Sequence, residues 1–326
     1  ALADHEALDA IFSSGAMAGF RALGAGLSFQ GIAPEADVSL RAGQLLGAPM
    51  DPTEARGFSG RLFTAFNAMS PSAPRTPIIS VFRRGKTFVY DPDLDRYVMN
   101  EDLEGAPDNG VRFILYEPGI GGKPDPAAEI GHADLMDEGD GSAEDIALRL
   151  VVVEGTDTIL EYATTVDHAD GTGRITVDGF LQGEQDRLDF EIGVRGSTAG
   201  AENSVDISFE MAIASRSFLI QGAVSGVESE SGEGGEVNLL VRHGNDSFQV
   251  DAAGTDTSID GTVKLNGDLF ATITGDPEDP TITGATGEAL TWNEALVLRQ
   301  ILDSTEDVFD FWEDLLDPLD ELIILA

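Results

Sequence analysis

The spacing of apolar and polar residues changes along the chain and separates a long central region from the two ends. Between residues 77 and 284 the apolar positions recur at every second residue, as in "LDFEIGV" (188–194) and "VDISFEMAI" (205–213). Strict alternation is typical of strands with one buried and one solvent-facing side, the pattern of antiparallel sheets. Because no helical segment of about 10–15 residues separates these strands, parallel βαβ topology is not expected.

The turns of the central region favour a meander, in which each strand pairs with the next. Asn266-Gly267 lies inside "VKLNGDLF", and this dipeptide is the strongest short-range signal for a two-residue hairpin. Gly, Asp and Asn recur at the spacing of a strand plus a turn. We therefore predict a mainly β fold, a long twisted antiparallel meander sheet over residues 77–284.

The region before the sheet, residues 1–76, is predicted to be irregular with short helices. Residues 4–13 read as a helix capped by Asp4, with an apolar face that includes Leu8. Residues 14–76 are rich in Gly, Ala, Phe, Met and Pro, with further short helices expected around 36–46 and 60–68.

Helical spacing returns in residues 285–326. Thr291 and Glu294 in "TWNE" form a capping-box pattern that predicts a helix start. A second helix is predicted from about Ser304 to Pro318, where proline ends it. The two helices are expected to pack as a pair on one face of the sheet.

Composition removes several classes of function. The chain has 326 residues, 42% of them apolar, and no cysteine, so disulfides, zinc-thiolate sites and thiol nucleophiles are excluded. The formal net charge is −40, which opposes binding to the phosphates of nucleic acids.

The charge is distributed unevenly. Residues 1–100 contain nine basic and ten acidic residues, a net of −1, whereas the remaining 226 contain ten basic and 49 acidic residues, a net of −39. The nearly neutral part includes a small basic cluster, formed by Arg75, Arg83, Arg84 and Lys86. Two interpretations remain open: the cluster balances local acids, or it belongs to a contact surface free of repulsive charge.

Three aspartates at alternate positions, Asp91, Asp93 and Asp95, invite comparison with a calcium loop. An EF-hand requires glycine at the sixth position, where this chain has Arg96. The flanking segments "TFVY" and "RYVM" are strand-like, so the sequence favours a hairpin turn and predicts no metal site.

No other motif predicts catalysis. "EPGIGGKPD" (117–125) lacks the first glycine and the final Ser or Thr of a phosphate-binding loop. The histidines share no metal-ligand spacing, and each is expected to be a solitary surface or turn residue: His5, His132, His168 and His243. The chain is therefore expected to be neither an enzyme nor a cofactor-binding protein.

Two segments, "GKTFVYDPDLDRYV" and "GAPDNGVRFILYEP", resemble a group of uncharacterised, exported, β-rich bacterial proteins over residues 77–165. In the same bacterial group, a double-ring photosystem holds its reaction centre and light-harvesting rings with membrane-extrinsic polypeptides. The chain is similar to what such an accessory subunit would be. This resemblance implies a periplasmic, membrane-peripheral location; the start "ALAD", without methionine, fits either a mature exported form or a trimmed chain.

We therefore expect a non-catalytic extrinsic subunit that docks on a membrane protein complex without spanning the bilayer. The alternative is an extracytoplasmic carrier whose curved sheet and helical lid enclose an apolar ligand. Flexible and aromatic apolar residues are enriched at interfaces, and the expected partner-binding residues are Met17, Phe20, Phe58, Phe63, Phe66, Met69, Arg75, Arg83, Arg84 and Lys86. The opposing interpretation makes Phe63 and Phe66 ordinary core and the arginines solvated.

Overall fold

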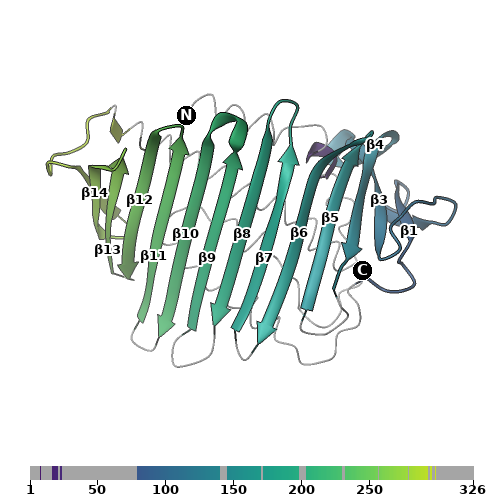
Figure 1. Cartoon of the computed structure of the whole chain (residues 1–326), viewed down its shortest axis with the longest axis horizontal. Helices are drawn as coiled ribbons and strands as arrows, with labels where there is room; N and C mark the ends of the chain where they lie inside the picture. The colour runs from purple at the N-terminus through teal and green to yellow at the C-terminus, as the bar shows by residue number, and fades with distance from the viewer. Residues whose placement is uncertain are drawn as a thin grey trace.

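One long sheet makes up most of the described protein (Figure 1). The structure is a computed structural model, and it describes residues 79–139, 145–169, 172–197, 203–229, 232–255, 257–277 and 279–292, with Leu8, 17–20, Leu23, Glu294, Ala295 and Leu298. The fifteen strands of the sheet are β1 Lys86–Asp91, β2 Arg96–Asn100, β3 Gly110–Pro118, β4 Pro124–Asp137, β5 Asp145–Glu154, β6 Asp157–Ala169, β7 Thr172–Gln182, β8 Arg187–Ser197, β9 Asn203–Ile213, β10 Phe218–Ser229, β11 Gly232–His243, β12 Asp246–Thr255, β13 Ser258–Leu265, β14 Asp268–Asp276 and β15 Asp279–Gly284.

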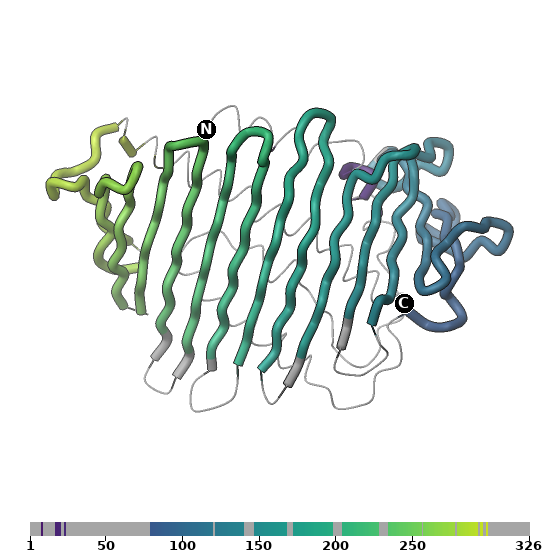
Figure 2. Tube along the Cα trace, viewed as in Figure 1, coloured from purple at the N-terminus to yellow at the C-terminus, as the bar shows by residue number. Residues whose placement is uncertain are grey.

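The strand order confirms the predicted meander. From β3 to β15 each strand pairs antiparallel with its neighbour in sequence, and the colour in Figure 2 accordingly changes steadily from one end of the sheet to the other. The pairing of β1 with β3 is parallel, with Phe88 opposite Phe113. This exception arises because the β1–β2 hairpin joins the sheet through β1, leaving β2 as the edge strand.

Alternation along the strands gives the sheet one apolar and one polar face. In β8 the side chains of Leu188, Phe190, Ile192 and Val194 are all buried, while Arg187, Glu191 and Arg195, on the other face, are exposed. Cross-strand register carries the apolar face across the sheet, since Val194 lies opposite Ile207 and Ile207 opposite Val224. Burial of this face is the main stabilising contribution, at about 25 cal/mol per Å² of apolar surface.

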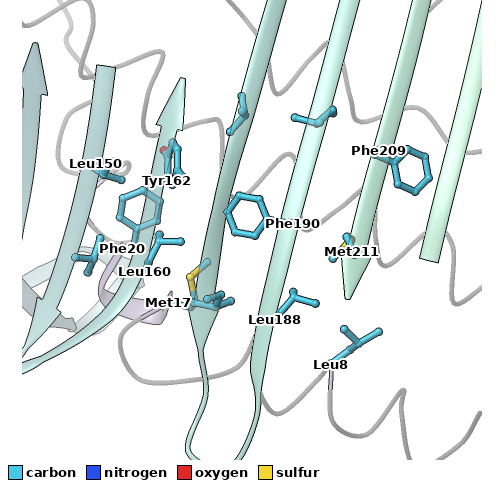
Figure 3. Close-up of a cluster of buried hydrophobic side chains, with 14 of the residues drawn as sticks. Leu8, Met17, Phe20, Leu150, Leu160, Tyr162, Leu188, Phe190, Phe209 and Met211 are labelled. Carbon is cyan, nitrogen blue, oxygen red and sulfur yellow. The ribbon is translucent and has the colours of Figure 1, made fainter. Parts of the chain in front are cut away.

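Residues from both ends of the chain pack on the apolar face. Leu8, Met17, Phe20 and Leu23 occupy helical positions and are buried in the same hydrophobic core as the strands. Figure 3 shows Leu8, Met17 and Phe20 among side chains of β5, β6, β8 and β9 that include Leu150, Tyr162, Leu188 and Met211. Leu8 is helical, but the rest of the predicted helix 4–13 and the helices predicted around 36–46 and 60–68 lie outside the described residues.

Two local predictions are confirmed, one by backbone dihedral angles and one by hydrogen bonds. Asn266 and Gly267 both have positive φ, 52° and 85°, and they join β13 to β14, as the predicted two-residue hairpin requires. At the C-terminal helix, the Glu294 carboxylate accepts a bond from the Thr291 backbone N–H at 2.8 Å, and Thr291 Oγ1 accepts one from the Glu294 backbone N–H at 3.4 Å.

The predicted C-terminal pair of helices is not supported. The capping box fixes the start of one helix, which includes Trp292, Glu294, Ala295 and the buried Leu298. The second helix, expected from Ser304, lies outside the described residues. The supported architecture is therefore the long sheet with one short helical segment after it.

The core contains a buried hydroxyl group that can be tested. Thr164 lies on the apolar face of β6, opposite Leu148 and Val177, and its Oγ1 has no hydrogen-bond partner among the described residues. Thr164→Val keeps the shape but removes the unpaired polar group, so we expect urea denaturation to show about 1 kcal/mol more stability. Thr165→Val, on the polar face of the same strand, should give no such gain; a destabilised Thr164→Val protein would contradict this assignment.

Candidate interaction surface

The turn before β1 presents apolar side chains to solvent. The backbone N–H groups of Arg83 and Arg84 both donate to Ser80 O, at 2.8 and 3.2 Å. Gly85 has φ +72°, which favours glycine, and its N–H donates to Gly110 O at 2.8 Å, at the start of β3. These bonds hold the turn against the sheet, while the Val81 and Phe82 side chains remain 71% and 89% exposed.

The three basic residues of this turn have different roles. Arg84 donates through Nε to Ile79 O at 3.1 Å and through Nη2 to Asp137 Oδ2 at 2.9 Å. Because the Asp137 side chain is almost fully buried, this ion pair ties the turn to the end of β4. Arg83 and Lys86 are partly buried and form no ion pair with any residue in the described part of the chain.

Other exposed apolar residues lie close by in the fold. Met99 is in the edge strand β2, and Leu103 follows that strand; both are more than 40% exposed. Because Thr87 pairs with Asn100, these two residues lie toward the same end of β1 as the turn. We define the β1–β2 surface as Val81, Phe82, Arg83, Lys86, Met99 and Leu103.

The strands beneath this surface are fixed by an aromatic cluster on the apolar face. The Phe113 ring stacks on Phe88 with centroids 5.1 Å apart, and it meets Tyr97 edge-on at 5.6 Å. Tyr97 also donates its hydroxyl to Ile114 O at 2.9 Å. The β1–β2 surface therefore rests on a packed support.

The hairpin loop between β1 and β2 confirms the predicted turn. The Asp91 carboxylate accepts bonds from the backbone N–H groups of Asp93 and Leu94, at 2.9 and 3.2 Å. Asp95 has φ 53° and instead binds the Lys123 ammonium and the Tyr90 hydroxyl. These two bonds lower the pKa of Asp95, and the bond from Lys123 is the larger cause. The pKa of Tyr90 is raised to about 12, first by burial and then by its hydrogen bond to Asp95.

His132 does not fit the prediction of a solitary surface or turn residue. It lies within β4 on the polar face, with Nε2 3.8 Å from Asp134 Oδ2. Asp134 is held by the Arg112 guanidinium through two bonds of 2.7 Å. Sequence spacing missed this group because Arg112 and Asp134 become neighbours only through the pairing of β3 with β4.

This environment predicts a pH effect on stability. Burial first, and then the positive charge of Arg112, lower the pKa of His132 below 6.5, although Asp134 and Glu129 act in the opposite direction. As the pH falls, His132 is therefore protonated in the unfolded chain before it is protonated in the folded protein. The free energy of unfolding should fall as pH decreases through 6.5 toward the folded pKa.

Urea denaturation on both sides of this pH window measures the effect. His132→Gln should lose less stability over this window than the unsubstituted protein. Equal losses in the unsubstituted protein and His132→Gln would contradict the assignment.

The structure divides the partner-binding residues predicted from the sequence. Met17 and Phe20 are 0% exposed and belong to the core, so in this conformation they are not available to a partner. Arg84 is held by Asp137, and Arg83 and Lys86 remain accessible. Outside the described residues lie Phe58, Phe63, Phe66, Met69 and Arg75.

Sequence reasoning missed the apolar half of the β1–β2 surface. Val81 and Phe82 look like core residues by composition, but they stand directly before "RRGK" and outside any alternating run. Apolar residues in a Gly-containing turn beside cations were the available signal.

The polar face carries a row of acidic residues across three strands. Asp178, Glu191 and Glu210 lie directly opposite one another on β7, β8 and β9, where like charges are destabilising. No three His, Asp or Glu side chains in the described ranges lie close enough together to hold a metal ion. The row therefore contributes negative charge to this face and gives no metal assignment.

Two further observations bear on function. Of the helices in the described part of the chain, none is both long and apolar enough to cross a bilayer. No protein-family model matches the sequence, and no match was found among curated proteins or solved structures. The β1–β2 surface is therefore the feature of the protein that bears most directly on function.

Proposed function

We propose that this protein is a non-catalytic extrinsic subunit that docks on a membrane protein complex through its β1–β2 end. The observation that carries the proposal is the uneven distribution of exposed apolar side chains. Of the eight large apolar side chains that are exposed in the described residues, four belong to the β1–β2 surface and a fifth, Leu94, lies in the loop between β1 and β2. Clustered exposed apolar residues mark interaction sites more often than scattered ones do.

The rest of the sheet offers little comparable surface. Its apolar face is buried, in part under Leu8, Met17 and Phe20, and its other face carries charged residues in β8 such as Arg187, Glu191 and Arg195. The same packing favours docking over the carrier alternative, because the protein's own side chains occupy the position over β5–β9 where a carried ligand would lie.

The distribution of charge also favours docking through the β1–β2 end. Residues 101–326 have a net charge of −39, which resists close approach to an anionic membrane. A complex bound at the β1–β2 end leaves most of the acidic strands in water. The resemblance noted for residues 77–165 suggests as partner a photosynthetic reaction-centre and light-harvesting complex, bound on the periplasmic side.

Affinity capture from gently solubilised membranes of the native organism tests the proposal. The tagged chain should retain reaction-centre or light-harvesting polypeptides, identified by mass spectrometry. Met99→Ser combined with Leu103→Ser should lose them. Leu269→Ser is a matched control, since Leu269 is 43% exposed and Met99 is 44% exposed, but Leu269 lies in β14 near the other end of the sheet.

The comparison is informative only if all variants melt at similar temperatures. Equal capture by the double variant and the control, or retention of no membrane polypeptide by the unsubstituted chain, would rule out docking through this surface.

A further inference from the structure

The turn before β1 has the properties of a small membrane-contacting tip. Phe82 is the most exposed of the large apolar side chains in the described residues, and its neighbour Val81 is 71% exposed. The two side chains are adjacent in a turn that is hydrogen-bonded to Ser80 and to the start of β3. They are therefore held at the surface by ordered backbone.

Two cations stand beside this apolar pair. Arg83 and Lys86 have no ion-pair partner among the described residues. Arg84, by contrast, is bound to Asp137 and anchors the turn. An apolar tip flanked by available cations matches an anionic lipid surface, whose phosphates attract Lys and Arg and whose acyl boundary accepts Phe and Val.

Size favours lipid over protein as the contact of the tip itself. A stable protein interface buries about 800 Å² on each partner, far more than two side chains on a turn provide. Insertion into a headgroup layer needs no matching concave surface. We infer that Val81 and Phe82 insert into the headgroup region of an anionic membrane while Arg83 and Lys86 bind its phosphates.

The shape of the sheet makes this contact compatible with the negative charge. The tip adjoins β1, at one end of the strand order, and strands are spaced about 4.8 Å apart. Charges more than about 8 Å away are largely screened at physiological ionic strength, so strands beyond the first few contribute little repulsion. Nearby acids such as Glu101 and Asp102 do oppose binding, so both the apolar pair and the cations should be required.

The inference deepens the proposed function, on which it rests, by naming lipid as a contact of the docking end. Flotation of the purified full chain with vesicles tests it separately from complex capture. The protein should float with phosphatidylcholine–phosphatidylglycerol vesicles, less at higher salt, and not with phosphatidylcholine alone. Phe82→Ser, and separately Arg83→Gln with Lys86→Gln, should each weaken binding about tenfold or more.

Trp292→Ser is the matched control, because Trp292 is 76% exposed but follows β15 at the other end of the sheet. It should bind vesicles like the unsubstituted chain.

Insertion can be distinguished from simple adsorption because the chain contains no cysteine. Val81→Cys labelled with an environment-sensitive fluorophore should shift its emission to the blue on mixed vesicles, and the same label at Leu269→Cys should not. Equal shifts at the two positions would overturn insertion.

Absence of vesicle binding by the unsubstituted chain, or unchanged binding by Phe82→Ser, would overturn the inference. If Phe82→Ser instead abolished only the capture of membrane polypeptides, the tip would contact protein, and the proposed docking would survive without the lipid contact. Vesicle binding without capture of any complex would have the opposite meaning: the tip would bind lipid, and the docking proposal would fail.

Discussion

Phe20→Ala is expected to lower the free energy of unfolding by about 3–5 kcal/mol, the usual cost of truncating a fully buried phenylalanine. Phe20 is 0% exposed, and its ring lies beside Leu150, Leu160 and Tyr162 on the apolar face (Figure 3). Alanine would leave a cavity between the N-terminal helical segment and the central strands. Urea denaturation followed by far-UV circular dichroism measures the loss.

The same experiment discriminates between two roles for Phe20. A partner-binding residue at the surface would change stability by less than about 0.5 kcal/mol and weaken capture of the partner instead. Phe82→Ala is the matched control, since Phe82 is 89% exposed. Equal stability of the two variants would place Phe20 outside the core.

Phe113→Ala should also lower the free energy of unfolding by about 3–5 kcal/mol, in this case by removing a ring beneath the β1–β2 hairpin. Phe113 is buried and its ring contacts both Phe88 and Tyr97, so its removal leaves the β1–β2 hairpin without its central packing partner. Urea denaturation gives the magnitude. A double-mutant cycle with Tyr97→Ala should show a coupling of about 0.5–1.5 kcal/mol beyond the separate losses.

This variant also links stability to docking. Because the β1–β2 surface rests on the Phe113 cluster, Phe113→Ala should weaken vesicle binding under conditions where most of the protein is still folded. Phe190→Ala removes a buried ring from β8, away from the hairpin, and should destabilise the fold without that selective effect. A stability loss below about 1 kcal/mol for Phe113→Ala would contradict the structural role given to the cluster.

The local sequence pattern was sufficient to predict the strands because each strand has one buried side and one solvent-facing side. The alternation from Leu188 to Val194 predicted which residues are buried in β8, and Asn266-Gly267 predicted the β13–β14 turn. These features depend on a residue and its immediate neighbours, so a single sequence contains the information.

Features created by distant pairing were not predictable in the same way. Arg84 reaches Asp137, 53 positions away, and no local pattern distinguishes it from the accessible Arg83. Gly222 lies opposite Phe209, and a Cβ at Gly222 would stand 2.2 Å from that ring. Glycine is required there by a neighbour in another strand, which the sequence of β10 alone does not reveal.

The strand order also shapes how the protein folds. From β3 to β15 every pairing joins strands that are consecutive in the chain, so the average sequence separation of contacts is low for a β protein, and low contact order favours rapid folding. The sheet behaves as a linear array in which each hairpin depends mainly on its neighbours, as in repeat proteins. Folding can begin in the central hairpins and spread outward, and native-state hydrogen exchange should show protection declining from β8 toward both ends.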